Sequence, residues 1–303
     1  MMRHYSVERL AAGVYAALAT NEGSAGCNAG IIDLGDRTLL FDTAATLSAA
    51  RELRALAVEL TGRAPSYVVN SHEHPDHYNG NAVFDDALLI TSAATREAMA
   101  RGGAARMAGM RRQIEERAAG VRQALAQSTE PERRGQLEAE LQEYMAFSEG
   151  YPHEEDLRLA ALTFTGSLAW VGTARTAQMI AYGPAHSACD TVLWLPTERV
   201  LFTGDLVVDG GDLILALGTP ENWPPVLDRL AGLGAERIVP GHGAVVGAAE
   251  GLGQAQAYLA EIFRLAGQAA AAGLTADEVA APAGWTEYWF RRNMRRLLEL
   301  SPV

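Results

Sequence analysis

The chain carries His72-Glu73-His74-Pro75-Asp76-His77 shortly after the strand-like run Tyr67-Val68-Val69-Asn70, and this stretch decides its fold. Three of the seven histidines lie in these six residues. A strand sends alternate side chains to the same face, so His72 and His74 can point together at one metal ion. Pro75 interrupts the strand, and the turn after it can carry Asp76 and His77 to a second ion. Because imidazole and carboxylate groups bind catalytic zinc, the stretch predicts a metal site rather than a solvated polar loop.

Three more ligand-type side chains stand at the ends of predicted strands. The apolar segments 179–182, 200–202 and 237–239 are each followed by small residues and then by His186, Asp205 and His242, respectively. Binding groups of layered α/β folds collect at strand ends of this kind, so we expect these side chains to meet the first stretch. Five of the seven histidines then belong to one predicted site.

The ordered set of His-x-His-x-Asp-His, a distant histidine, Gly-Asp and Gly-His resembles the metallo-β-lactamase-fold hydrolases and spans residues 30–243. The resemblance implies an α/β fold, an αββα four-layer sandwich in which two sheets lie between helices. It also implies the ligands of two metal ions: His72, His74 and His186 for the first, Asp76, His77 and His242 for the second, and Asp205 bridging both.

The resemblance implies two zinc ions as cofactors, although imidazole and carboxylate ligands also accept iron or manganese. Two such ions can share a hydroxide, polarise a carbonyl group and stabilise a leaving group. Asp76 would hold the second ion, orient the hydroxide and accept a proton, which makes it the predicted catalytic residue. The predicted function is a metal-dependent hydrolase that uses a metal-bound hydroxide to cleave a small-molecule thioester, ester or lactone.

Three other functions stay open at this point. A persulfide-dioxygenase-like enzyme would use one iron ion in the same pocket. A β-lactamase-like amide hydrolase is a poorer match, because such enzymes are usually exported and lack the bridging aspartate. A non-catalytic metal- or ligand-binding protein belongs to a different class. Replacing Asp76 by alanine separates the last idea from a hydrolase, since only the hydrolase would lose turnover.

The composition limits which partners and which cellular compartment we expect for the protein. The net charge of −12, from 25 basic and 37 acidic residues, predicts a small-molecule substrate and no nucleic-acid partner. All basic residues are arginine, so Schiff-base chemistry through lysine is excluded. No run of about 18 apolar residues predicts a membrane span. The apolar segment 10–19 reads equally well as a signal peptide or a first strand, and we favour the cytoplasm.

One domain is predicted over residues 1–303, with a helical hairpin inserted at about 93–150 and helices closing the chain at about 248–303. The methionines of the insert suit either a lid over a hydrophobic substrate or a homodimer interface. Its arginines recur mostly every five residues, which spreads them around a helix instead of forming one anion-binding face.

Several residues near the predicted ligands have two interpretations. Asp42, after the strand-like segment 38–41, either holds a ligating histidine by its other ring nitrogen or caps the strand end. Ala44 stands where the family often has glycine, so the turn is expected to differ. Asp190 and Thr191 are weaker candidates for the same supporting role. Cys189 is expected to be a small buried side chain and not a ligand.

The aromatic and basic segment 285–296 also has two interpretations. Its arginines fall on one face of a helix, and glyoxalase II-type thioesterases of this fold bind a glutathione conjugate with C-terminal basic residues. An amphipathic helix that packs its aromatic side chains on the core explains the same pattern, and we favour it.

Overall fold

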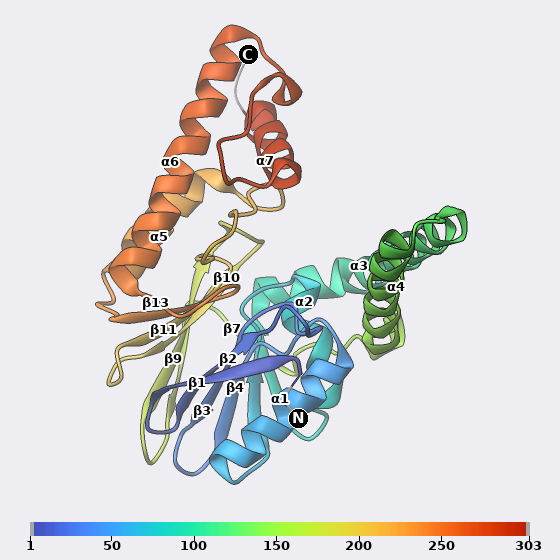
Figure 1. Ribbon diagram of the computed structural model, residues 1–303. Coiled ribbons are helices and arrows are strands. Elements are labelled where there is room, and N and C mark those ends of the chain that lie inside the picture. Colours follow the sequence, from blue (N-terminus) through green and yellow to red (C-terminus); the bar gives the residue numbers. More distant parts are fainter. Residues whose placement is uncertain (1–2, 301–303) are drawn as a thin grey trace.

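Two β-sheets packed face to face form the centre of the computed structural model, which describes residues 3–300 (Figure 1). The first sheet has the order β1 (Tyr5–Ala11), β2 (Val14–Ala19), β3 (Ala29–Asp33), β4 (Thr38–Phe41), β5 (Pro65–Val69), β6 (Leu88–Ser92) and β7 (Leu162–Phe164). Its strands pair antiparallel from β1 to β4 and parallel from β4 to β7. The second has the order β13 (Val246–Gly247), β12 (Arg237–Pro240), β11 (Val200–Gly204), β10 (Asp190–Leu195), β9 (Thr176–Gly183) and β8 (Ser167–Val171).

Helices cover the outer face of each sheet. Neighbouring residues of a strand point to opposite faces, so Leu39 packs in the core between the sheets while Leu40 packs under α1 (Leu47–Thr61). In the second sheet Phe202 belongs to the same central core, whereas Leu201 faces the outer helices. These outer helices are α5 (Trp223–Ala231), α6 (Ala248–Ala272) and α7 (Glu287–Leu300). The predicted α/β four-layer sandwich is therefore confirmed.

The predicted helical hairpin consists of α3 (Ala93–Gln127) and α4 (Pro131–Gly150), which extend away from the sheets (Figure 1). Ser92 caps α3 by accepting a hydrogen bond of 3.0 Å from the Thr95 N–H. Met99 and Met107 are fully buried at the root of the hairpin, so they form its core and are not free for a lid or a dimer contact. Met110 and Met145 are exposed, so a lid and a homodimer interface both stay predictions.

Short helical turns complete the chain: α2 (Pro75–Tyr78), η1 (Asn79–Val83), η2 (Glu154–Asp156), η3 (Pro220–Asn222) and η4 (Ala276–Glu278). The sequence predicts a first strand or a signal peptide at residues 10–19. This segment forms parts of β1 and β2, joined by a turn. Within residues 3–300, no helix is long and apolar enough to cross a bilayer.

Three elements escape the sequence pattern. Strand β8 has one buried residue, Trp170, so its hydrophobic alternation is weak. Strand β13 has only two residues. Helix α5 begins with Trp-Pro-Pro, which reads as a break, although proline is tolerated in the first turn of a helix because its missing N–H has no intrahelical partner there.

Glycine in place of Ala44 is expected to stabilise the fold. The backbone of Ala44 has a φ of 104°, where a Cβ is strained; such strain costs about 1–3 kcal/mol, against about 0.8 kcal/mol for one buried methyl group. Glycine also has more freedom in the unfolded chain, which costs about 0.4–1 kcal/mol, so Ala44→Gly should raise the free energy of unfolding by about 0.5 kcal/mol in urea titrations. The matched control Ala45→Gly, at a residue with no positive φ, should lower it. A loss of stability in both variants would contradict the strain argument.

Candidate metal centre

Four chain segments bring the predicted site residues to one edge of the sandwich. His72 and His74 follow β5, and His186 follows β9. Asp205 and His242 follow β11 and β12, which run parallel and therefore end at the same edge. Asp76 and His77 lie in α2, which Pro75 begins. All seven side chains gather in two groups, His72, His74, His186 and Asp205 in the first and Asp76, His77 and His242 in the second.

In the first group three imidazole nitrogens converge. His74 Nδ1 lies 3.1 Å from His72 Nε2 and 2.8 Å from His186 Nε2. Asp205 Oδ2 lies 3.3 Å from His186 Nε2 and 3.8 Å from His72 Nε2. Ligand atoms bound at about 2.0–2.1 Å to one tetrahedral zinc ion would be about 3.3 Å apart. The four atoms therefore have nearly the spacing of a single tetrahedral site.

The second group meets the other oxygen of the same carboxylate. Asp205 Oδ1 lies 3.1 Å from His77 Nε2 and 3.3 Å from His242 Nε2. Asp76 Oδ2 lies 3.5 Å from each of the same two nitrogens. Asp205 therefore turns one oxygen to each group, which is the geometry expected of a bridging ligand.

Two buried atoms at this junction, His77 Nε2 and Asp205 Oδ1, lie 3.1 Å apart but have no hydrogen bond of acceptable geometry among the described residues. A buried polar atom without a partner costs about 1–3 kcal/mol, and more when it is charged. A cation bound between the groups would remove this cost. The residues present therefore fit a metal ion.

The pKa shifts in the first group favour unprotonated histidine nitrogens and an ionised aspartate. Burial lowers the pKa of His186 to about 3, and burial together with the neighbouring histidines lowers the pKa of His72 well below its usual value. Both rings are therefore neutral at pH 7. Burial would raise the pKa of Asp205, but the charges of His242 and His77 outweigh it and lower that pKa well below its usual range. Neutral imidazole and ionised carboxylate are the forms that coordinate a metal.

Asp42 holds His77 from behind, as one of its two interpretations predicted. Its Oδ2 lies 2.8 Å from His77 Nδ1, which leaves Nε2 facing the group. Its oxygens also accept hydrogen bonds of 2.7 and 2.8 Å from the Ser71 N–H and hydroxyl. One carboxylate therefore both caps the strand end and supports a histidine. Histidine ligands of metals commonly have such a carboxylate partner.

Asp190 fixes the backbone that carries His186. Its Oδ2 accepts hydrogen bonds of 3.0, 2.9 and 3.2 Å from the N–H groups of Ala185, His186 and Ser187. Asp190 therefore supports His186 through its backbone and does not hold a ring nitrogen, which was the role predicted for it. The ring nitrogen His186 Nδ1 instead lies 3.2 Å from the Ile214 carbonyl oxygen.

Asn293, which the sequence did not single out, holds the segment that contains Ile214. Its Oδ1 accepts hydrogen bonds of 2.8 and 3.1 Å from the N–H groups of Leu215 and Ala216. Its Nδ2 donates to the Leu213 carbonyl at 2.7 Å and to the Tyr258 hydroxyl at 3.2 Å. Asn293 is fully buried on α7. Through this one side chain, α7 supports the segment that contacts His186 of the first group. A single polar residue among Phe290, Met294 and Leu297 is the signal that would have found it.

Other candidates lie outside the two groups. Cys189 is buried and absent from them, as predicted. Cys27 is also buried, and its thiol donates to the Asp76 carbonyl at 3.1 Å. His153 is exposed in a separate group with Glu154 and Glu155.

The sequence favours a solvated helix for most arginines of the insert, and two of them depart from this interpretation. Arg106 and Arg111 are half-buried. Arg106 donates to the Ala98 carbonyl at 3.1 Å, and Arg111 donates to the Tyr151 carbonyl. Their guanidinium groups satisfy backbone oxygens at the root of the hairpin, a role that the five-residue period does not reveal.

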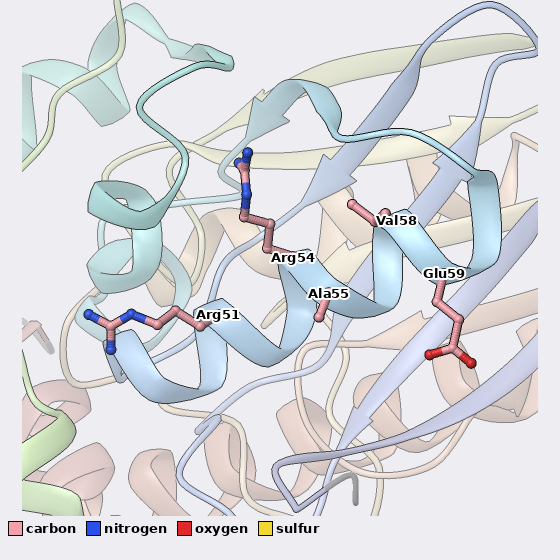
Figure 2. Close-up of a pocket in the computed structure, with 5 residues that line it drawn as sticks. All are labelled: Arg51, Arg54, Ala55, Val58 and Glu59. Atoms are coloured by element: carbon pink, nitrogen blue, oxygen red, sulfur yellow. The ribbon is translucent and has the colours of Figure 1, made fainter.

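A hollow of about 470 Å³ on the outer face of α1 has no part in this site (Figure 2). All of its lining residues belong to that helix: Arg51, Arg54, Ala55, Val58 and Glu59. Arg54 is occupied by Asp86 through hydrogen bonds of 2.7 and 2.6 Å. The hollow is one face of a single helix and contains none of the clustered side chains.

A two-sheet α/β sandwich with histidine and aspartate side chains gathered at one edge is the architecture of a metallo-hydrolase. The model of the metallo-beta-lactamase superfamily matches residues 23–242, and the chain belongs to this superfamily. It is therefore a superfamily hydrolase whose histidine and aspartate groups suggest metal binding.

Solved structures agree on the fold. A metallo-beta-lactamase from Pontibacter korlensis has a TM-score of 0.61 and 17% identity, over 84% of this chain and 99% of that chain. The metallo-beta-lactamase FIM-1 from Pseudomonas aeruginosa, in a mono-zinc form, has a TM-score of 0.59 and 17% identity, over 85% and 95%. At this identity the likeness shows the fold alone.

One curated relative is similar over a short stretch. The Beta-lactamase-like protein 2 homolog of Caenorhabditis elegans is 37% identical over 63 residues, which are 21% of this chain and 21% of that protein. The match therefore spans about a fifth of the relative's length.

Removing the amide of Asn293 is expected to weaken metal binding at the first group. Without its four hydrogen bonds the segment around Ile214 can move, and the His186 ring loses its fixed orientation. Asn293→Ala should lower metal affinity about 10–100-fold in competition with a chelator. Asn293→Asp, which keeps the acceptor for Leu215 and Ala216, should lose less.

The control is Phe290→Leu, which removes fully buried packing from the same helix. It should lower the melting temperature while leaving metal affinity unchanged. If Asn293→Ala likewise lost only stability, Asn293 would be a packing residue without influence on His186.

Proposed function

We propose that the two groups bind a pair of zinc ions and that the protein is a dinuclear hydrolase. The ligands would be His72, His74 and His186 at one ion, Asp76, His77 and His242 at the other, and Asp205 between them. The observation that carries the proposal is the orientation of Asp205, whose oxygens lie 3.3 Å from His186 Nε2 on one side and 3.1 Å from His77 Nε2 on the other. Iron and manganese accept the same donor atoms, so metal content has to be measured.

Bound divalent ions would polarise a substrate carbonyl and bring the pKa of water to about 7. The side chains divide the remaining work. Asp76 and His242 are 31% and 35% exposed, whereas His72, His77 and His186 are buried. Substrate would therefore approach from the side of Asp76 and His242. There Asp76 is placed to orient the attacking water and accept its proton, while Asp42 and the Ile214 carbonyl keep the histidines in position.

The substrate we propose is a small-molecule thioester, ester or lactone, cleaved in the cytoplasm. The carboxylate between the groups supports this choice over a β-lactam, because the resemblance associates a bridging aspartate with the thioesterase and lactonase branch. A β-lactam amide is the second candidate, since the solved neighbours are titled as metallo-beta-lactamases.

Metal counting tests the two-ion arrangement. The protein purified with zinc should contain two ions per chain by plasma mass spectrometry. His242→Ala should retain one ion, because the first group keeps three imidazoles and Asp205. The zinc-loaded protein should also melt at a higher temperature than the chelated protein, since a ligand of the native state alone stabilises it. One ion per chain in the wild type would contradict the dinuclear proposal.

Proton release in weak buffer tests the reaction class. The zinc-loaded protein is offered acyl thioesters, lactones, aryl esters and β-lactams, all of which yield a carboxylic acid on hydrolysis. Turnover is expected on one acyl group and should disappear on chelation. Asp76→Ala should lower kcat by at least about 100-fold, while Glu261→Gln on the exposed face of α6 should leave it unchanged. Turnover of β-lactams alone would replace the proposed substrate class with the second candidate.

A further inference from the structure

A cavity of about 340 Å³ lies between the segment after β11 and the C-terminal helices. Its walls are residues 208–213 on one side and residues 254–258 and 284–286 on the other, and they include Asp209, Asp212, Gln254, Tyr258, Trp285 and Thr286. A volume of this size lies in the range of small-molecule sites, which begins at about 300 Å³. The hydrolytic chemistry described above does not use any of these side chains.

The cavity adjoins the exposed side of the candidate metal centre. The Asp209 N–H donates to the His242 carbonyl at 3.0 Å, so the wall of the cavity is bonded to a histidine of the centre that is 35% exposed. The same wall begins just after Asp205 and ends at Leu213, whose carbonyl Asn293 holds. One segment therefore forms both the edge of the metal-type groups and the wall of the cavity.

The charges that line the cavity are all negative. Asp209 Oδ2 accepts the Ala244 N–H at 3.0 Å, and Asp212 Oδ2 accepts the Thr286 N–H at 2.8 Å, which leaves the second oxygen of each carboxylate without a backbone donor. Neither carboxylate forms an ion pair with an arginine or histidine in the part of the chain that the structure describes. No basic residue lines the cavity.

Aromatic rings provide the second half of the lining. Tyr258 and Trp285 are stacked, with ring centroids 4.0 Å apart and an angle of 16° between their planes. Electron-rich tyrosine and tryptophan rings attract organic cations such as quaternary ammonium groups. The carboxylates of Asp209 and Asp212 lie beside these rings, and that of Asp212 is also hydrogen-bonded to the Tyr258 hydroxyl. Their negative charges, which no cation of the described residues neutralises, are complementary to a positive charge that carries apolar substituents.

We propose that this cavity is a subsite for a cationic organic group, such as an alkylammonium, on the part of the substrate away from the cleaved bond. The binding of the cation follows from the cavity alone, whereas its place in a substrate rests on the proposed hydrolase function. The protein would then select acyl compounds that carry an amine or quaternary ammonium group over neutral or anionic ones.

Calorimetry with choline tests the binding, and its uncharged isostere 3,3-dimethylbutan-1-ol is the matched ligand. Choline is expected to bind at least tenfold more tightly than the isostere to the full chain, both zinc-loaded and chelated. Asp212→Asn keeps an acceptor for Thr286 and should weaken choline at least fivefold without changing the isostere. Trp285→Leu should weaken both ligands. Glu261→Gln, a charge change on the outer face of α6, should change neither.

Equal affinity of the two ligands, no heat with either, or choline binding that Asp212→Asn and Asp209→Asn leave unchanged would overturn the proposal. The chelated protein separates this result from the hydrolase proposal, because cation binding there does not depend on catalysis. If choline binds and the protein hydrolyses an acyl panel, choline should inhibit competitively, raising KM and leaving kcat unchanged. Failure to inhibit would remove the cavity from the substrate path.

Discussion

The buried carboxylate of Asp205 is the interaction on which the arrangement of the strand ends depends. It is 6% exposed, and its two oxygens face imidazole nitrogens from three other chain segments. A buried charge is costly unless it is paired, and here its Oδ1 has no hydrogen bond among the described residues. This cost arises at the edge of the sandwich where the ends of β5, β9, β11 and β12 meet. A cation bound at this edge would offset the cost of burying the Asp205 carboxylate.

Contacts from neighbouring residues hold the predicted ligand side chains in fixed positions. His77 is held by Asp42, and His186 is held by the Ile214 carbonyl and by the Asp190 carboxylate under its backbone. Each support comes from a different element of the fold, so no single strand defines the site. Gly218 shows how tightly this shell is packed, because a Cβ there would lie 2.0 Å from the Ala185 carbonyl oxygen.

The predicted metal ligands could be found from the sequence, because their spacing forms a motif. The residues that support them through tertiary contacts could not. The hexapeptide at 72–77 has a local pattern, so the turn at Pro75 and its place at a sheet edge follow from it. The prediction that His72 and His74 alternate along a strand was wrong, because β5 ends at Val69 and both residues lie in the loop after it. Asn293 lies on a helix that looks like ordinary amphipathic packing, and its role exists only once the segment at 213–216 folds against it. The contact of Arg111 cannot be predicted for the same reason, since its acceptor at Tyr151 is 40 residues away.

The proposed cation subsite assigns substrate selectivity to a part of the chain that has no recognisable sequence motif. The segment from Asp205 to Gly218 begins with the carboxylate between the two groups, passes Asp209 beside His242, and supports His186 through Ile214. Its outer side lines the acidic cavity. Because one stretch of backbone sets both the histidine geometry and the cavity wall, a change that reshapes the cavity also perturbs the metal-type groups. The substrate range of this protein is therefore expected to change with substitutions on the C-terminal helices, which face the cavity from the other side, more readily than with substitutions in this segment.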